Sequence, residues 1–247
     1  GGDGGPGVKP GAEFARVLEV FSSIQGEGAR LGERQVFVRF GGCNLLCGYC
    51  DEPKSIPRSA GEVRGSDGLK EDILRLCAGR SHAAVSWTGG EPLLFAPFLK
   101  GMMAWARREG LENCLETNGT LAGELRRVAA LADCISMDVK LSSDAGGAFW
   151  RAHRAFLSVA PEKTFVKTIL TGNTREEEVL ELIGLLEDFP GVRLYLQPAT
   201  RVPSLREKGC WVRAMPPRRV LALLKLCREK LDDARLQPQW HPIWGLP

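Results

Sequence analysis

The feature that most constrains the fold is the alternation of strand and helix patterns from residue 66 to the end of the chain. Short runs of β-branched and aliphatic residues are followed by amphipathic stretches with helical periodicity. This alternation is typical of a parallel sheet whose strands are joined by right-handed helical crossovers. The chain is too short after its cysteine-rich loop for a complete barrel. The sequence therefore predicts an α/β fold, a partial (open) βα barrel of roughly six parallel βα units.

The individual strands and helices are expected at definite positions. Residues 1–12, rich in Gly and Pro, are expected to form a disordered tail, which leaves a single domain over 13–247. Residues 52–66 are expected to form a loop. The expected strands are 16–21, 35–40, 83–87, 111–116, 134–139, 164–170, 192–196 and 234–236, and the expected helices are 67–77, 97–108, 121–131, 145–156, 176–187 and 217–231.

Composition and charge exclude several classes of protein. The formal net charge is only +3 over 247 residues, and Lys and Arg are scattered, so no nucleic-acid partner is expected. No apolar run reaches membrane-spanning length and no signal-peptide pattern opens the chain, so no membrane partner is expected. Eight cysteines without regular pairing argue against a secreted disulfide scaffold. A reducing compartment, the cytoplasm, is the expected location.

Polar segments follow most of the expected strands at their carboxyl ends. In parallel βα folds these ends meet at one edge of the sheet, where ligands bind. Each segment alone also has a structural interpretation, because Thr-Gly-Gly and Asn-Gly are common turn signals. Together the segments predict one polar mouth of a barrel. They are residues 88–92, 116–119, 136–140, 168–171, 197–198 and 239–241.

Cys43, Cys47 and Cys50 form a C-x3-C-x2-C array in a glycine-rich loop. Thiolates this close together can face one metal centre, and soft thiolates select zinc or iron–sulfur clusters. Structural zinc sites and closed clusters have four protein ligands, whereas the nearest further candidates, Cys77 and His82, lie beyond a polar loop. Three ligands leave one metal position open for chemistry. A group of free cysteines, or a zinc loop with a distant fourth ligand, is the alternative.

Two further charged residues are candidate ligand-binding groups. Arg39 is a cation in an otherwise apolar strand, four residues before Cys43. Its planar fork suits carboxylates, although an exposed position on an edge strand is the structural alternative. Glu91 follows two glycines in an expected strand-to-helix turn, where it can bind an ammonium group or support the loop.

The cysteine spacing, with Gly-Gly-Glu-Pro at 89–92, resembles the radical S-adenosylmethionine (radical SAM) superfamily. The resemblance implies a barrel of the radical SAM type and a [4Fe–4S] cluster on Cys43, Cys47 and Cys50, with S-adenosylmethionine on the fourth iron. It also implies an electron donor such as flavodoxin or ferredoxin. The residues that it implies for S-adenosylmethionine are Tyr49, Asp51, Gly89, Gly90, Glu91, Glu116, Asn118, Ser136, Asp138, Lys140 and Gln197.

A narrower resemblance is carried by Ser23-Ile-Gln-Gly-Glu-Gly28, Arg39, the Cys-Asp pair ending the cysteine loop, and the segment Trp240–Pro247. These features are similar to the 7-carboxy-7-deazaguanine synthase family, and the resemblance covers residues 16–51, 83–140 and 197–247. It implies a lyase that converts 6-carboxy-5,6,7,8-tetrahydropterin to 7-carboxy-7-deazaguanine and ammonia in queuosine and deazapurine biosynthesis. A 5′-deoxyadenosyl radical takes a hydrogen atom from C6, and its return regenerates the cofactor.

A pterin substrate requires particular side chains. Gln25 and Glu27 can supply donors and acceptors for its guanidine-like edge, and Arg39 can meet its carboxylate. The resemblance implies that the terminal carboxylate of Pro247 also reaches the substrate, and that the protein is a homodimer. The expected substrate-binding residues are Ile24, Gln25, Gly26, Glu27, Arg39, Thr88, His241 and Pro247.

One position departs from the family pattern. The residue after Cys-Asp is commonly a Thr whose hydroxyl binds Mg²⁺, and here it is Glu52. A carboxylate is a hard oxygen ligand that could hold Mg²⁺ more strongly, or it could repel the substrate carboxylate.

Two alternative functions share the cysteine spacing. A glycyl-radical activating enzyme acts on a protein partner and needs neither the Ser23–Gly28 segment nor the fixed C-terminal segment, so both count against it. A non-catalytic iron–sulfur or zinc protein would use the cysteine loop for structure alone.

Overall fold

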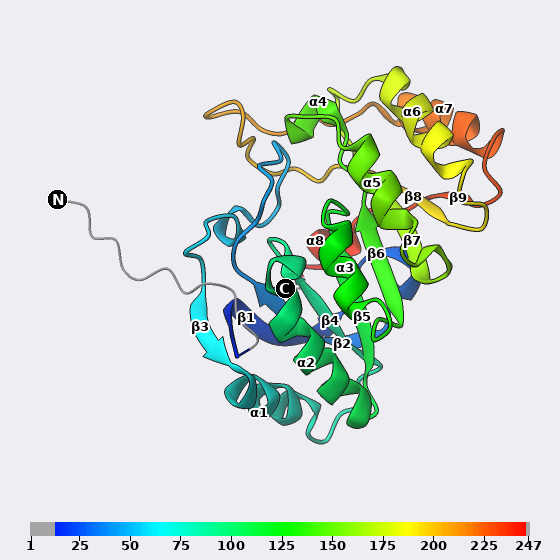
Figure 1. Cartoon of the computed structure of the whole chain (residues 1–247). Helices are drawn as coiled ribbons and strands as arrows, with labels where there is room; N and C mark the ends of the chain where they lie inside the picture. The colour runs from blue at the N-terminus through cyan, green and yellow to red at the C-terminus, as the bar shows by residue number, and fades with distance from the viewer. Residues whose placement is uncertain (1–12, 246–247) are drawn as a thin grey trace.

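The computed structural model describes residues 13–245, and its central element is a nine-stranded sheet (Figure 1). The strand order is β3-β1-β2-β4-β5-β6-β7-β8-β9. β1 is antiparallel to both β2 and β3, whereas every neighbouring pair from β2 to β9 is parallel. The expected open βα barrel is therefore confirmed. The strands are β1 (Phe14–Ile24), β2 (Arg34–Phe40), β3 (Glu62–Gly65), β4 (Ala84–Gly89), β5 (Glu112–Thr117), β6 (Cys134–Asp138), β7 (Thr164–Leu170), β8 (Leu194–Pro198) and β9 (Ala234–Leu236).

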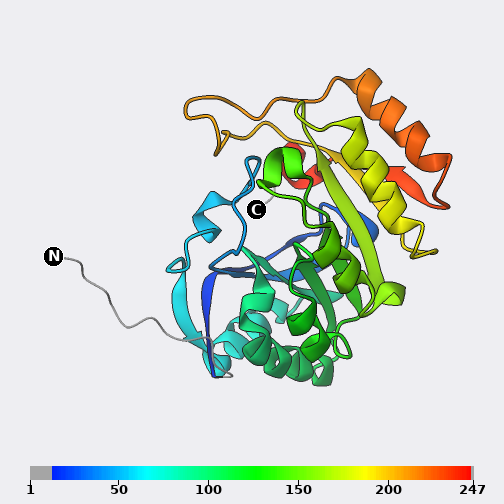
Figure 2. The same ribbon diagram turned by 45° about the horizontal axis from the view of Figure 1, so that its top comes forward.

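Helices follow one another around one side of the curved sheet (Figures 1 and 2). Among the residues described, no helix has the length and apolar character needed to cross a bilayer. The α-helices are α1 (Ser66–Cys77), α2 (Ala96–Arg108), α3 (Ala122–Val128), α4 (Ser142–Ala145), α5 (Trp150–Leu157), α6 (Glu176–Leu186), α7 (Pro217–Arg228) and α8 (Trp240–Trp244), and the short 3₁₀ helices are η1 (Gly28–Arg30), η2 (Pro53–Ser55), η3 (Pro92–Phe95) and η4 (Pro161–Lys163).

The core lies between the sheet and these helices. β4 is central in the strand order and five of its six residues are buried. Its Trp87 is fully buried, and the indole N–H donates to Asn113 Oδ1 at 2.8 Å, so its polar atom is satisfied. α2 buries Leu99, Met102, Met103 and Ala106, the spacing of one helix face. Buried parallel strands covered by amphipathic helices are what the sequence pattern predicts.

The structure differs from the sequence-based expectation in several local elements. β3 forms within the expected loop 52–66, because it pairs with the free edge of β1 rather than through its own pattern. The expected helix 145–156 is two helices, since Gly146 has a φ of +81° and ends α4. α3 and α7 end three residues before the expected limits, and α8 was not expected as a helix.

Candidate active site

An open cavity lies at the carboxyl ends of the parallel strands, where the polar segments were expected to gather. Its walls come from the end of β1, the cysteine loop after β2, and the turns that follow β4, β5, β6 and β8. β7 contributes two residues near its end, and Gln239 contributes from just before α8. Segments that are far apart in sequence thus share one cavity.

The three cysteines of the loop lie on one wall of this cavity. Cys47 is buried, and Cys43 and Cys50 are half-buried. Burial raises the pKa of each thiol, and burial with the neighbouring Asp51 carboxylate raises that of Cys50 to about 12. The Lys140 ammonium acts in the opposite direction on all three thiols. Metal binding must therefore displace protons from these thiols, and Lys140 favours that step.

Within residues 13–245 no group of three or more His, Cys, Asp or Glu side chains is placed to hold one metal ion. In a four-iron cluster each cysteine binds a different iron, so the three sulfurs need not converge on a single point.

Two glycines fit the turn after β4 against the backbone that leads into the cysteine loop. The N–H of Gly90 donates to Phe40 O, and the N–H of Glu91 donates to Gly42 O, both at 2.9 Å. A Cβ on Gly90 would lie 2.2 Å from Gly42 O, and Gly89 has a φ of +133°. Glycine, which has no Cβ, allows both the close approach at Gly90 and the positive φ at Gly89. The pair therefore fixes the position of the cysteine loop on the sheet.

Glu91 stabilises this turn through hydrogen bonds of its side chain. Its side chain is fully buried and accepts hydrogen bonds from Leu93 N–H at 3.0 Å, Thr117 Oγ1 at 2.9 Å and Asn118 N–H at 2.8 Å. Burial raises the pKa of Glu91 to about 7 against the effect of these donors. Glu91 is absent from the cavity lining as described. The geometry thus favours the supporting role over direct binding of an ammonium group.

Asn118 ties the end of β5 to the cysteine loop. Its Nδ2 donates to Asn44 Oδ1 at 2.9 Å, and its Oδ1 accepts from Thr120 Oγ1 at 2.6 Å. The Asn118 carbonyl is 3.2 Å from His153 Nε2. Burial lowers the pKa of His153 to about 4, so this imidazole is neutral at pH 7 and donates one hydrogen bond. The network fixes one side of the cavity.

Lys140 forms a cationic centre beside the cysteines. Its Nζ lies 2.7 Å from Asp138 Oδ2 and 5.1 Å from the centre of the Tyr49 ring. Burial opposes its charge, but Asp138 and other negative groups raise the pKa of Lys140 well above its usual value. The Tyr49 hydroxyl and Asp138 Oδ1 are buried without a hydrogen-bond partner in the described structure. Both atoms are therefore available to a ligand.

Glu116 centres a second polar network. Its Oε1 accepts from Gln25 Nε2 at 2.8 Å and Ser86 Oγ at 3.1 Å, and its Oε2 accepts from Thr88 Oγ1 at 2.9 Å. Gln25 and Thr88 were expected on the substrate side, whereas Glu116 was expected to meet S-adenosylmethionine. In the structure Glu116 therefore contacts two residues that were expected to bind the substrate.

Glu27 centres a third network with the C-terminal part of the chain. It forms an ion pair with Lys167, and its Oε1 accepts from Gln239 Nε2 at 2.8 Å. Burial opposes the charge of Lys167. The carboxylates of Glu27, Asp138 and Glu116 nevertheless raise the pKa of Lys167. The N–H of Trp240 donates to Gly26 O at 3.2 Å. α8 therefore begins directly against the Gln-Gly-Glu segment.

Arg39 also lines the cavity. Its Nε lies 2.6 Å from Glu19 Oε1, and its guanidinium carbon lies 5.6 Å from the centre of the Phe21 ring. β2 lies between β1 and β4, so the alternative of an exposed edge position is wrong. The guanidinium is held by a carboxylate and an aromatic face on one side of the cavity.

Comparison with known proteins decides the family. A sequence model of the radical SAM superfamily matches residues 37–188. The chain is 35% identical over 262 residues to 7-carboxy-7-deazaguanine synthase of Geobacter sulfurreducens, covering 96% of this chain and 98% of that protein. The chain belongs to the 7-carboxy-7-deazaguanine synthase family of radical SAM proteins.

One further relative is similar in sequence and one solved structure is similar in fold. The 7-carboxy-7-deazaguanine synthase of Methanothermobacter thermautotrophicus is 46% identical over 128 residues, which cover 52% of this chain and 50% of that protein. The crystal structure of QueE from Escherichia coli is similar in fold, with a TM-score of 0.62 at 20% identity over 92% of this chain and 94% of that one.

Most residues expected from the 7-carboxy-7-deazaguanine synthase resemblance meet in the one cavity. The expected residues that line it are Cys43, Cys47, Cys50, Glu52, Tyr49, Asp51, Gly89, Gly90, Glu116, Asn118, Asp138, Lys140, Ile24, Gln25, Gly26, Glu27, Arg39 and Thr88.

The remaining expected residues lie elsewhere or outside the described structure. Ser136 lines a small second cavity, beside Cys114 and Cys134. Gln197 is fully buried, and neither of its amide atoms has a hydrogen-bond partner in the described structure. His241 lies in α8, but its side chain is outside the described part, and Pro247 lies outside the described residues altogether.

Five polar lining residues were not among the site residues expected from the sequence, namely Ser55, Thr117, Lys167, Thr200 and Gln239. Lys167 is the one charged residue of strand β7, and a lone cation in a buried strand is the same signal that identified Arg39. Gln239 opens one of the expected polar segments, but only its contact with Glu27 shows its place. Thr200 lies in a loop and carries no sequence signal.

The residues present fit the cofactors of the 7-carboxy-7-deazaguanine synthase family. Three thiols share one wall, and a buried ammonium stands beside them. Unpartnered buried polar atoms are costly, and such atoms occur on the lining residues Tyr49 and Asp138. A ligand that hydrogen-bonds to them would remove that cost.

Proposed function

We propose that this protein converts 6-carboxy-5,6,7,8-tetrahydropterin to 7-carboxy-7-deazaguanine in queuosine and deazapurine biosynthesis. The reaction balances as an intramolecular ring contraction with loss of one ammonia. The observation that carries the proposal is that one cavity joins the three-cysteine wall to the networks of Glu27 and Glu116. Family membership supports the same activity.

The cysteine side of the cavity would hold the cofactors. When bound, the cluster and S-adenosylmethionine supply the removal and return of a hydrogen atom at a substrate carbon. Cys43, Cys47 and Cys50 would bind iron. Lys140 would neutralise negative charge beside them, and the backbone at Gly89 and Gly90 would allow close approach of the methionyl group.

The opposite side would orient the pterin. Carboxylates accept hydrogen bonds from guanidine-like N–H groups, which suits Glu27 and Glu116. Lys167 pairs directly with the Glu27 carboxylate, which raises the pKa of Lys167 against the effect of burial. Arg39 would anchor the substrate carboxylate with the guanidinium nitrogens that the Nε–Glu19 contact does not use.

The electron donor, the cellular location and the oligomeric state are also part of the proposal. An external carrier protein would supply the electron, as flavodoxin or ferredoxin does for radical SAM chemistry. All eight cysteines are free thiols, which suits the cytoplasm. The homodimer stays a prediction.

An anaerobic assay tests the function directly. Reconstituted protein with dithionite, S-adenosylmethionine and the carboxytetrahydropterin is expected to release 7-carboxy-7-deazaguanine and one ammonia per turnover, with S-adenosylmethionine recovered. Mass spectrometry of the products is the measurement. Cleavage of S-adenosylmethionine with the pterin left unchanged would contradict the proposal.

Arg39→Ala is expected to lower kcat/KM for the pterin by about tenfold or more, because one charge-assisted contact is lost. S-adenosylmethionine affinity should change little. Steady-state kinetics and equilibrium binding measure the two effects. Arg193→Ala is the matched control, since it removes an arginine–aspartate pair at the other end of the strands. Equal losses of cofactor and substrate affinity in Arg39→Ala would assign this residue to loop structure.

We further propose that Glu52 binds Mg²⁺ together with the substrate. Glu52 lines the cavity and is half-buried, and Mg²⁺ commonly takes one or two carboxylates plus substrate oxygens. Glu52→Gln and Mg²⁺-free buffer are each expected to lower kcat/KM by about tenfold, without a further loss when combined. Glu62→Gln in the exposed part of β3 is the control. Full activity of the wild type without Mg²⁺ would exclude this site.

A further inference from the structure

The segment between β8 and α7 forms a hairpin beside the cysteine loop (Figure 2). An isolated antiparallel bridge pairs Pro203 with Trp211, and the N–H of Ser204 donates to Cys210 O at 2.9 Å. We name residues 201–213 the basic hairpin. The two arms of the hairpin are therefore held together by backbone pairing.

The basic hairpin touches the loop that carries the iron ligands. The N–H of Leu205 donates to Gly48 O at 3.0 Å, and Gly48 directly follows Cys47. A Cβ on Gly48 would lie 3.0 Å from Arg206 Cδ, so the Arg206 side chain packs on this glycine. A partner seated on the hairpin would therefore lie next to the cysteine wall.

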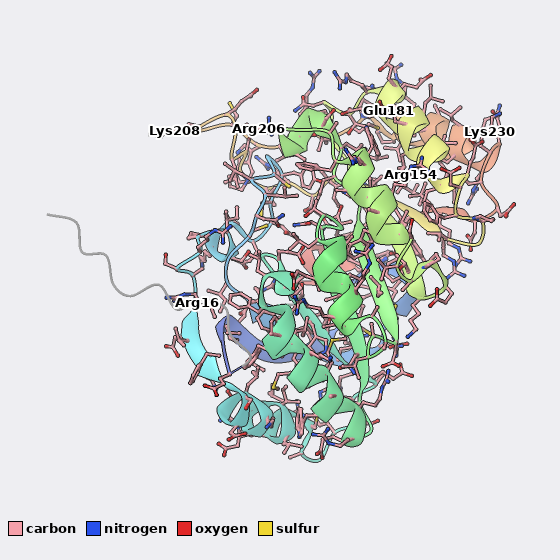
Figure 3. All side chains as sticks on the ribbon, viewed as in Figure 1. Arg16, Arg154, Glu181, Arg206, Lys208 and Lys230 are labelled. Atoms are coloured by element: carbon pink, nitrogen blue, oxygen red, sulfur yellow. The ribbon has the colours of Figure 1, made fainter. Side chains whose placement is uncertain are left out.

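The exposed surface of the hairpin is basic with an apolar part. It carries the cations Arg201, Arg206, Lys208 and Arg213 and one carboxylate, Glu207, all exposed. This excess equals the formal charge of the whole chain, +3. Figure 3 shows Arg206 and Lys208 at the edge of the molecule, on the side away from Lys230.

Three large apolar side chains accompany these charges. Trp211 is 53% exposed, Leu205 37%, and Leu46 of the cysteine loop 59%. Arg201 lies over the Trp211 ring at 4.6 Å, which holds this aromatic residue at the surface. Exposed apolar residues within a charged rim are typical of small, transient protein interfaces.

We propose that the basic hairpin, with Leu46, is the docking surface for a small acidic one-electron carrier protein. The proposal rests on the proposed function, which requires an electron at the cysteine wall. One electron leaves the reduced carrier, whose flavin or iron–sulfur group is oxidised by one electron, and reduces the bound cluster by one. No bond forms or breaks. Charge complementarity selects an acidic partner and speeds its association.

Charge reversal of Lys208 tests this surface. In the holoenzyme, Lys208→Glu is expected to lower the rate of S-adenosylmethionine cleavage driven by limiting reduced flavodoxin at least fivefold at low salt. The dithionite-driven rate should stay unchanged, because a small inorganic reductant needs no docking surface. Affinity for oxidised flavodoxin should fall in parallel and depend less on salt. Lys230→Glu on the far side is the matched control. Trp211→Ala should weaken flavodoxin binding without changing its salt dependence.

Several results would overturn the proposal. Equal losses with both reductants would make the hairpin a structural support of the cysteine loop. Unchanged flavodoxin affinity in Lys208→Glu would exclude docking here. The hairpin would instead be an RNA-binding surface if transfer RNA competed with flavodoxin for the wild type, and if Lys208→Glu lost transfer RNA binding but kept the flavodoxin-driven rate. Failure of the proposed function looks different, since wild type would then leave the pterin unchanged while flavodoxin still drives cleavage of S-adenosylmethionine.

Discussion

Replacing Cys43, Cys47 or Cys50 by Ala is expected to abolish reductive cleavage of S-adenosylmethionine. Each thiol lines the same wall, and two protein ligands cannot hold a cluster that normally has three here. Iron and sulfide per chain should fall from about four of each toward zero in anaerobically purified protein. The fold should survive, because none of these side chains belongs to the main apolar core. Metal analysis and far-ultraviolet circular dichroism measure the two effects.

Cys77→Ala is the matched control for this series. Cys77 ends α1 and is half-buried, so its removal costs little and touches no cavity residue. It should keep full iron content. A loop variant that retains four irons and wild-type cleavage would remove that cysteine from the ligand set.

The second large effect is expected for Gly90→Ala. The added methyl group would lie 2.2 Å from Gly42 O and 2.8 Å from Ser55 O, which are backbone atoms that cannot turn aside. The turn after β4 and the cysteine loop must separate, and the hydrogen bond from Glu91 N–H to Gly42 O is lost with them. We expect most of the cluster to be lost and activity to fall about a hundredfold, with a stability cost of a few kcal/mol.

Gly101→Ala is the control for that change. Gly101 lies in α2 and a Cβ there would have nothing within 4 Å. Alanine should therefore be neutral or stabilise by about 0.5–1 kcal/mol. Iron content and the midpoint of denaturant unfolding measure both variants. A Gly90→Ala protein with full iron content would show that the two backbones can move apart without releasing the cluster.

The local sequence pattern predicted the repeating strands and helices, because the packing of helices on a sheet requires particular patterns of apolar residues. A buried parallel strand is rich in aliphatic and β-branched residues, and the helix that packs on it is amphipathic, so both are visible in the sequence. β3 was not visible, since a four-residue segment with a single large apolar side chain becomes a strand only when the edge of β1 is available. The break between α4 and α5 was signalled by Gly146, but its importance depends on the left-handed backbone adopted there.

The candidate site was most visible in the sequence where its residues are close along the chain. Cys43, Cys47 and Cys50 lie within eight residues of one loop, so their common place on one cavity wall could be predicted from spacing alone. Lys167 carried the same signal as Arg39, a lone cation in a buried strand, and could have been found by it.

The sequence alone determined the open barrel, the cysteine wall and the Gln-Gly-Glu segment, because periodicity and short-range spacing encode them. Only the tertiary structure decided that Glu91 supports a turn, that Glu27 pairs with Lys167 across the fold, and that the basic hairpin lies against Gly48. These relations join residues that are far apart in the chain. They depend on strand register and loop packing, which no local pattern of residues specifies.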